Sequence, residues 1–228
     1  MRKRSKRYEK AAALLEKDKR YTVAEAIELL ARMPKPKFDE SVVLCVRLGI
    51  DAKKSDQIVR GAYSLPNGIG KSVRVAVFAE GEQAEAAQAA GADFVGSQEL
   101  ADKIAKEGWM DFDVAIAHPS MMRVVGKLGK VLGPQGKMPT PKAGTVTEAV
   151  AQAVREFKAG KIEFRNDAGG NLHAMVGKRS FEPQKLQENV EAFIEHVRTT
   201  RPVTAKGNFI LGATLSGAMS PGIALAVA

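Results

Sequence analysis

The segment SVRVAVFAE, Ser72–Glu80, decides the fold of the middle of this chain. It is apolar and rich in β-branched residues, which is typical of a strand buried on both faces of a parallel sheet. EQAEAAQAAGA then predicts a helix ending at Gly91, DFVGS a short strand, and QELADKIAKEG a helix closed by Gly108. FDVAIAHP predicts a third strand and SMMRVVGKLGKVLG a third helix. This alternation predicts a Rossmann-like, three-layer α/β unit with a parallel sheet and right-handed crossovers.

The two outer parts of the chain follow another pattern. YTVAEAIELLARM predicts an amphipathic helix that begins with a capping box of Thr22 and Glu25, and FDESVVLCVRLGI (Phe38–Ile50) predicts a long strand. KIEFRND and NLHAMVGKR are expected to be two strands joined by a turn at Ala168-Gly169-Gly170. The helix PQKLQENVEAFIEHVRTTR and one or two strands in FILGATLSGAM and GIALAV complete an α+β layer, an antiparallel-rich sheet with helices on one face.

One further helix is expected between the two patterns. The segment TVTEAVAQAVREFKAG, Thr145–Gly160, leads from the middle of the chain back to its end. Either Thr145 or Thr147 is a candidate N-cap residue for it.

The distribution of charge predicts the domain organisation. Of the net charge of +9, residues 1–67 carry +7, residues 68–159 carry zero and residues 160–228 carry +2. Each outer part is small for a private hydrophobic core. We therefore expect an α+β domain built from residues 1–67 and 160–228, with residues 68–159 inserted as the Rossmann-like domain; three independent pieces are the alternative.

Composition narrows the class of protein. Hydrophobic residues make up 45% of the chain, enough for a buried core, and the excess of 35 Lys and Arg over 26 Asp and Glu favours an anionic partner such as nucleic acid. The single cysteine, Cys45, excludes an intramolecular disulfide and a cysteine zinc cluster. No apolar run approaches the roughly 20 residues that span a bilayer, and the basic N-terminus lacks the apolar run of a secretory signal. We expect a cytoplasmic protein without a membrane partner.

A nucleotide-dependent enzyme that uses the middle domain is the alternative function. The strand at Ser72–Glu80 is followed by EGEQAEAAQ, whose acidic residues would repel a pyrophosphate. The glycine- and lysine-rich stretch LGPQGKMPTPKAGTV, Leu132–Val146, lacks the spacing of a phosphate-binding loop. His118 ends a parallel strand without metal-type neighbours, and His196 is expected to be solvated on a charged helix. We therefore predict no catalytic residue, no metal site and no cofactor.

Several basic segments favour RNA as the partner. The first twenty residues hold nine basic and three acidic side chains, as expected of an arm that contacts phosphates. PKPKFDES (Pro34–Ser41) and KIEFRND (Lys161–Asp167) each combine cations, an acid or hydroxyl and a phenylalanine. Such groups can bind phosphates, ribose hydroxyls and bases. Phe38 and Phe164 could instead belong to the core, which is the stronger interpretation for Phe164.

Six segments, in this order, resemble the family of bacterial ribosomal protein L1. They are KFDESV, SDQIVRGAYSLPNGIGK, GWMDFDVAIA, LGKVLGPQGKMPTPKAGTV, AGKIEFRND and HAMVGKRSF, and the resemblance runs from about Arg7 to Pro221. It implies a two-domain protein of the large ribosomal subunit, ribosome-bound in the cytoplasm, in which the domain built from both chain ends binds 23S ribosomal RNA. It also implies a place at the mobile stalk near the exit-site tRNA, a role in release of deacylated tRNA, and repression of translation through the messenger RNA of its own operon.

The resemblance also implies an RNA-binding site. By matching motifs, the site residues are Lys37, Phe38, Glu40, Ser41, Glu163, Arg165, Asp167, His173, Lys178, Ser216, Met219 and Ser220. The family's Thr-Met-Gly-Pro turn reads Ala218-Met219-Ser220-Pro221 here, so a hydroxyl is lost and a side chain replaces a glycine. We expect weaker RNA binding, or compensation by a neighbour such as Ser216. In the loop Leu132–Val146 and the helix before it, Lys127, Lys130, Lys137 and Lys142 are candidates for weak phosphate contacts, with stiffening of the loop as the alternative.

Overall fold

The computed structural model describes residues 4–16 and 18–227, and its contacts divide the chain into two compact units. Unit 1 contains the residues up to Gly70 and those from Ile162 onward, and unit 2 is Lys71–Lys161. These bounds lie within three residues of the expected ones. That each unit is an independent domain stays a prediction, tested below. No helix among the described residues is both long and apolar enough to cross a membrane.

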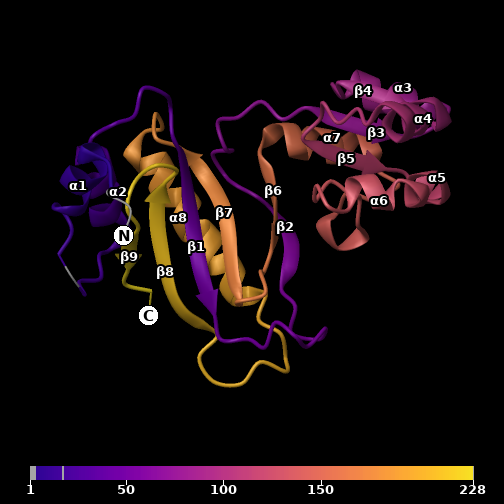
Figure 1. Cartoon of the computed structure of the whole chain (residues 1–228). Helices are drawn as coiled ribbons and strands as arrows, with labels where there is room; N and C mark the ends of the chain where they lie inside the picture. Colours follow the sequence, from indigo (N-terminus) through magenta and orange to yellow (C-terminus); the bar gives the residue numbers. More distant parts are fainter. Residues whose placement is uncertain (1–3, 17, 228) are drawn as a thin grey trace. The chain divides into compact units, whose positions relative to one another are not determined.

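Unit 1 is organised around a four-stranded antiparallel sheet in the order β7-β1-β8-β9 (Figure 1). Its strands are β1 (Ser41–Leu48), β7 (Asn171–Lys178), β8 (Ile210–Gly217) and β9 (Ile223–Leu225). Strand β1 lies at the centre because its alternate residues are apolar and buried, so one face of the sheet forms the core. The C-terminal segments expected to form one or two strands form two, β8 and β9.

Helices cover the buried face of this sheet. The long helix α8 (Pro183–Thr199) contacts α2 (Val23–Arg32) and β7, and α2 also contacts β8 and β9. The capping box at the start of α2 is confirmed, because the Thr22 hydroxyl accepts from the Glu25 N–H and the Glu25 carboxylate accepts from the Thr22 N–H. A short helix α1 (Lys6–Ala12) precedes α2.

The expected hairpin of KIEFRND and NLHAMVGKR is wrong in its pairing. Strand β6 (Lys161–Arg165) pairs with β2 (Arg60–Ser64), a strand that the sequence patterns did not indicate, in a separate two-stranded sheet. Only one bridge, Asn166 to Leu172, links the segment after β6 to β7. The turn at Ala168-Gly169-Gly170 exists, but the chain crosses there from one sheet to the other.

Unit 2 is the expected α/β unit, with a parallel sheet in the order β4-β3-β5. Strand β3 (Val75–Phe78) is central and buried at every residue, and β4 (Phe94–Gly96) and β5 (Val114–Ala117) flank it. Helices α3 (Glu82–Ala89) and α7 (Val150–Ala159) pack together on the sheet, and α4 (Gln98–Glu107) packs with α5 (Met122–Lys127).

Two expectations for unit 2 are corrected. The segment expected as one third helix is three short helices: a 3-10 turn at Pro119–Met121, then α5, then α6 (Gly129–Leu132). Helix α7 begins at Val150, later than expected, and no side chain caps it. Thr145 is buried in the preceding loop, whose next residue, Val146, bridges to Ala117 of β5, so tertiary contacts hold this segment out of the helix.

Candidate nucleic-acid interface

Residues from three distant segments converge at one end of the four-stranded sheet. The antiparallel register pairs Ser41 with Lys178 and Val43 with Ser216, because β1 starts where β7 and β8 end. The segment before β1 and the turn after β8 therefore lie beside each other. The predicted site residues at this end of the sheet are Lys37, Phe38, Glu40, Ser41, Lys178, Ser216, Met219 and Ser220.

Two large apolar side chains at this end face solvent. Phe38 is 54% exposed and Met219 is 53% exposed, whereas Phe164 is 2% exposed and packs edge-to-face on Phe193. Phe164 is therefore a core residue. Phe38 and Met219 are available to pack on a base or sugar, as aromatic and apolar side chains do in RNA-binding sites.

Glu40 is completely buried and supports the chain segments that form the candidate site. Its Oε1 accepts from Nη1 of Arg179 at 2.9 Å, and that arginine is itself almost buried. Nη2 of Arg179 donates to the Leu30 carbonyl at 2.6 Å and to the Met33 carbonyl at the end of α2. In this arrangement the Glu40 carboxylate faces protein groups, so we assign it a positioning role instead of a contact with a ligand.

The altered turn after β8 rests on the same carboxylate. The Ser220 hydroxyl donates to Glu40 Oε2 at 3.0 Å, and the Met219 N–H lies 3.5 Å from the same oxygen. Among the described residues other than glycine, only Asp18 has a positive φ, so Ser220 does not occupy a conformation that requires glycine. The serine in place of glycine is thus accommodated, and its hydroxyl anchors the turn.

Two arginines that the residue-by-residue prediction did not single out belong to this end of the sheet. Arg179 holds Glu40, and Arg7 of α1 donates from Nη2 to the Met219 carbonyl at 2.7 Å. Arg7 lies in the basic arm predicted to contact phosphates; Arg2, Lys3 and Lys17 of that arm lie outside the described residues. Arg179 follows Lys178 in the motif HAMVGKRSF, but nothing in the pattern distinguishes the buried cation from the accessible one.

The remaining predicted residues lie elsewhere in unit 1. Glu163 and Arg165 are exposed on β6 in the two-stranded sheet, and His173 lies opposite Cys45, midway along β1. Asp167 organises the crossing turn: its Oδ1 accepts from the Asn171 N–H at 2.7 Å, and this bond holds the pKa of Asp167 below its usual value. The structure does not bring these residues together with Phe38 and Met219 at the sheet end.

The glycine-rich loop Leu132–Val146 is anchored to the core of unit 2. The Lys137 ammonium donates to the Phe112 carbonyl at 2.6 Å and to the Met110 carbonyl at 3.0 Å. Inside the loop, the buried Thr145 hydroxyl accepts from the Thr140 N–H at 2.8 Å. Lys137 is thus committed to protein carbonyls, whereas Lys127, Lys130 and Lys142 are exposed. This geometry favours stiffening as the role of Lys137.

The turn after β3 is unsuited to a nucleotide. Helix α3 begins after Gly81 and carries Glu82 and Glu85 in its first turn. A phosphate at this helix start would meet two carboxylates, although the helix dipole alone would favour it.

His118 uses its ring nitrogen as an acceptor from the Ser120 N–H, and this bond caps the next helical turn. Among the described residues, no group of three or more His, Cys, Asp or Glu could hold a metal ion.

His196 was expected to be solvated, but the structure shows its ring packed against other aromatic side chains. Its ring stacks on Tyr63 with centroids 4.3 Å apart and meets the edge of Phe164 at 5.6 Å. Burial lowers the pKa of His196, because the charged form loses water contacts there.

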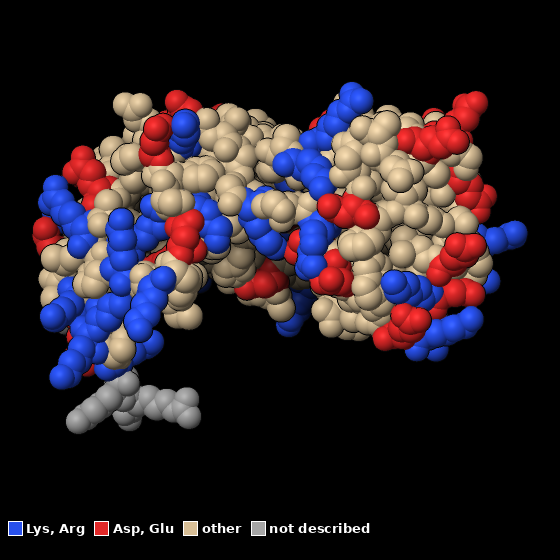
Figure 2. All heavy atoms as spheres, turned by 90° about the horizontal axis from the view of Figure 1, so that it is seen from above, with Lys and Arg blue, Asp and Glu red and all other residues tan. Residues whose placement is uncertain are grey.

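The balance of basic and acidic side chains differs between the two units. Figure 2 looks down on the end of the sheet where β1 begins and shows Lys and Arg side chains gathered over unit 1 and many acidic side chains on unit 2. The exposed cation Lys37 and the half-buried cation Lys178, whose ammonium lies 3.2 Å from the Ser41 hydroxyl, belong to the sheet end of unit 1. Cations, hydroxyls and an exposed aromatic ring thus lie together at this sheet end, and these are the kinds of group that RNA-binding sites use.

Comparison with known proteins identifies the family. A model described as the Ribosomal protein L1p/L10e family matches residues 29–221, and the chain belongs to this family. It is 57% identical over 225 residues to "Large ribosomal subunit protein uL1" of Fervidobacterium nodosum, covering 99% of this chain and 96% of the relative. The protein of the same name from Kosmotoga olearia is 56% identical over 225 residues, with 99% and 97% covered.

Proposed function

We propose that this chain is a structural protein of the large ribosomal subunit that binds 23S ribosomal RNA at the mobile stalk. Family membership supports the ribosomal role, and the placement of Phe38 and Met219 supports the RNA site at the sheet end. A ribosome-bound, cytoplasmic location follows from this function. The nucleotide-dependent enzyme is disfavoured, because the acids at the start of α3 would repel a phosphate.

The primary observation is that one buried residue, Glu40, supports both chain segments that carry the exposed apolar side chains. The chain segment carrying Phe38 and the turn carrying Met219 meet at Glu40, which bonds Arg179 on one side and Ser220 on the other. A preorganised surface loses little conformational entropy on binding. The missing threonine hydroxyl at Ala218 is the one motif group for which the neighbouring Ser216 would have to compensate.

The test is binding of the full chain to a stalk RNA fragment and to a scrambled hairpin across a salt series. We expect preference for the stalk fragment to persist as salt rises, because base and ribose contacts are less salt-dependent than phosphate contacts. Equal and steeply salt-sensitive binding to both RNAs would show a generic basic surface and would reopen the assignment.

A matched set of variants localises the site. Phe38→Ala and Met219→Ala should each weaken stalk RNA binding, Phe38→Ala by about tenfold, since stacking on a base contributes roughly 1–3 kcal/mol. Leu211→Ala is the control, because Leu211 is similarly exposed at 47% but lies at the opposite end of β8. Unchanged affinity in a folded Phe38→Ala or Met219→Ala protein would remove that residue from the site.

Two finer roles are proposed from the resemblance alone. The first is release of deacylated tRNA from the exit site, measured as the rate of tRNA departure from ribosomes with and without this protein. The second is repression of its own operon, measured as competition between the stalk fragment and the operon's messenger leader. If both RNAs use the same sheet end, Met219→Ala should weaken both to the same degree.

A further inference from the structure

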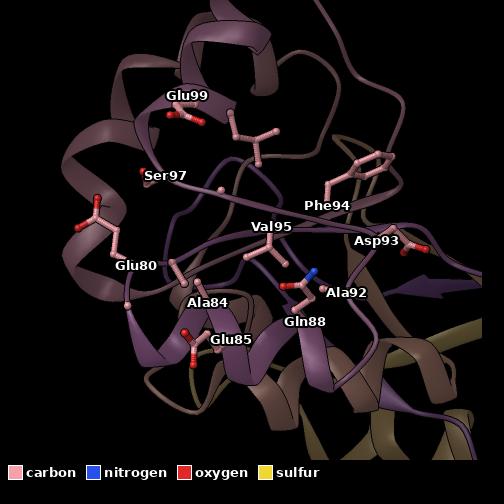
Figure 3. Close-up of a pocket in the computed structure, with 14 residues that line it drawn as sticks. Glu80, Ala84, Glu85, Gln88, Ala92, Asp93, Phe94, Val95, Ser97 and Glu99 are labelled. Atoms are coloured by element: carbon pink, nitrogen blue, oxygen red, sulfur yellow. The ribbon is translucent and has the colours of Figure 1, made fainter.

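A groove runs along the outer edge of the parallel sheet in unit 2, far in sequence from the RNA-binding motifs. Its volume is about 670 Å³, and it is lined by β4, by the residues that lead into α3 and α4, and by one side of α3. Figure 3 shows Gln88 of α3 and Val95 of β4 among the side chains that border it.

The sheet edge in this groove is open. Strand β4 pairs with β3 and is the last strand on that side of the sheet. The Gly96 carbonyl accepts from the Ala79 N–H at the end of β3, and successive residues of a strand point their backbone groups to opposite edges. The Val95 N–H and carbonyl therefore point toward the groove, where an added strand could bond to them.

The groove is acidic, and no lysine or arginine lines it. Glu80, Glu85 and Glu99 border it from the end of β3, from α3 and from α4. Asp93 also lines the groove, but its carboxylate is already bonded to Lys158 at 2.8 Å and to the Val75 N–H at 2.7 Å. Three carboxylates thus remain to act on whatever enters the groove.

The acidity reflects a segregation of charge within a unit whose 12 basic and 11 acidic side chains nearly balance. Residues 114–147 contain no Asp or Glu, and five of their residues are Lys or Arg. The acids of unit 2 therefore concentrate on the part of the chain that contains β3, α3, β4 and α4. An anion such as RNA would be repelled here, whereas a cation would be attracted.

Apolar side chains supply the other part of the groove's chemistry. Ala84, Val95 and Leu100 line it and are each only half-buried. A small cation would use the carboxylates alone. An extended peptide with alternating cationic and apolar side chains would use the carboxylates, the apolar positions and the free strand edge together.

We propose that this groove docks an extended, Lys- and Arg-rich segment of another protein, which adds to β4 as a further strand. The backbone of the segment bonds to Val95, and its cationic side chains face Glu80, Glu85 and Glu99. This interaction is separate from RNA binding and does not depend on the function of the sheet end in unit 1.

The charge part of the proposal is tested with a synthetic peptide of alternating lysine and valine and the full-length protein. The double variant Glu85→Lys/Glu99→Lys should bind the peptide at least tenfold more weakly than the unaltered protein. The matched control is Glu107→Lys/Glu148→Lys, which makes the same change of charge at two exposed acids of unit 2 outside the groove. Equal losses in both variants, or no loss in the first, would overturn the site.

The strand-addition part is tested on the unaltered protein, so it does not depend on any variant folding. The peptide N-methylated at alternate residues keeps its charge but loses its donors along one edge, and one of the two methylation registers should abolish binding. Hydrogen exchange at the Val95 amide should slow when the unmethylated peptide binds. Binding of both methylated peptides at full affinity, or exchange at Val95 that does not slow, would refute docking as an added strand.

Discussion

Glu40 and Arg179 form a salt bridge whose side chains are 0% and 5% exposed, and this pair connects the fold to the candidate site. An arginine kept from water needs acceptors for its charge, and it has the Glu40 carboxylate, the Leu30 carbonyl of α2 and the Met33 carbonyl just after α2. Its Nε is the one buried side-chain nitrogen or oxygen without a hydrogen-bond partner among the described residues. We therefore expect the loss of any further hydrogen-bond partner of Arg179 to destabilise the fold.

Replacing Glu40 by glutamine removes the negative charge and leaves Arg179 buried without a counter-ion. We expect Glu40→Gln to lower the free energy of unfolding by about 3–5 kcal/mol, the usual cost of breaking a buried pair, measured by urea titration. Glu28→Gln is the control, because Glu28 forms an exposed pair with Arg32 and should change stability by less than about 1 kcal/mol. Similar losses in both variants would contradict the role of Glu40.

The half-buried position of His196 makes a pH-dependent contribution to stability. Its pKa is lowered in the folded state, so below the ordinary value of 6.5 the unfolded state binds the proton first. This contribution is complete above that pH and is lost as the pH falls through the lowered folded pKa. His196→Phe, which keeps an aromatic ring against Tyr63, should reduce the loss of melting temperature on acidification. An undiminished loss in the variant would assign the pH dependence to other groups.

At the scale of elements, tertiary contacts override the local helix signal in the second half of unit 2. Glycines interrupt the segment expected as one helix, and both Gly126 and Gly129 fall at the junction of α5 and α6. The loop that follows is held by Lys137, whose ammonium bonds two carbonyls at the approach to β5. A lysine in a loop sequence suggests a surface charge, and only the folded unit shows that it closes the loop on the core.

Replacing Lys137 by methionine should loosen this loop without unfolding the protein. The two carbonyls lose a charged donor, and bonds to charged groups contribute about 1.5–3 kcal/mol. Hydrogen exchange should therefore accelerate in residues 133–147 and remain unchanged in unit 1. Lys142→Met is the control, since Lys142 is exposed in the same loop. Equal acceleration in both variants, or in neither, would refute the anchoring role.

At the scale of the whole molecule, the chain leaves unit 1 after Gly70 and returns to it at Ile162. The excursion begins and ends near the paired strands β2 and β6, which belong to distant parts of the sequence. Their pairing joins the N-terminal and C-terminal parts of the chain that make up unit 1, and both parts contribute residues to its core. Neither outer part of the chain has the strands to complete that sheet by itself.

Unit 1 should therefore fold and bind RNA when unit 2 is removed. The test joins the residues up to Gly70 to those from Ile162 onward through a short glycine–serine linker. We expect cooperative unfolding and retained preference for the stalk RNA, because Phe38, Met219 and their supporting residues all lie in unit 1. A folded protein without RNA affinity would move the site to include unit 2, and an unfolded one would refute the prediction of an independent domain.

Local patterns in the sequence were enough to predict several parts of this protein. The capping box at Thr22, the buried strand β3 and the alternation of unit 2 follow from propensity and periodicity, which act over a few residues. The motif around Phe38 was likewise readable as a candidate site from its cations, hydroxyl and aromatic ring, whereas the turn at Met219 was indicated only by the resemblance to the family.

Contacts between distant residues, and the burial of individual side chains, could not be predicted in the same way. Strand pairing assigned β6 to a separate sheet with β2, and the β1 register placed Ser41 beside Lys178. The folded structure buries Glu40, which supports the candidate site from inside, and leaves Phe38 exposed. The physical reason is that burial and long-range pairing depend on the whole set of packed segments, whereas the sequence displays only the preferences of each segment alone.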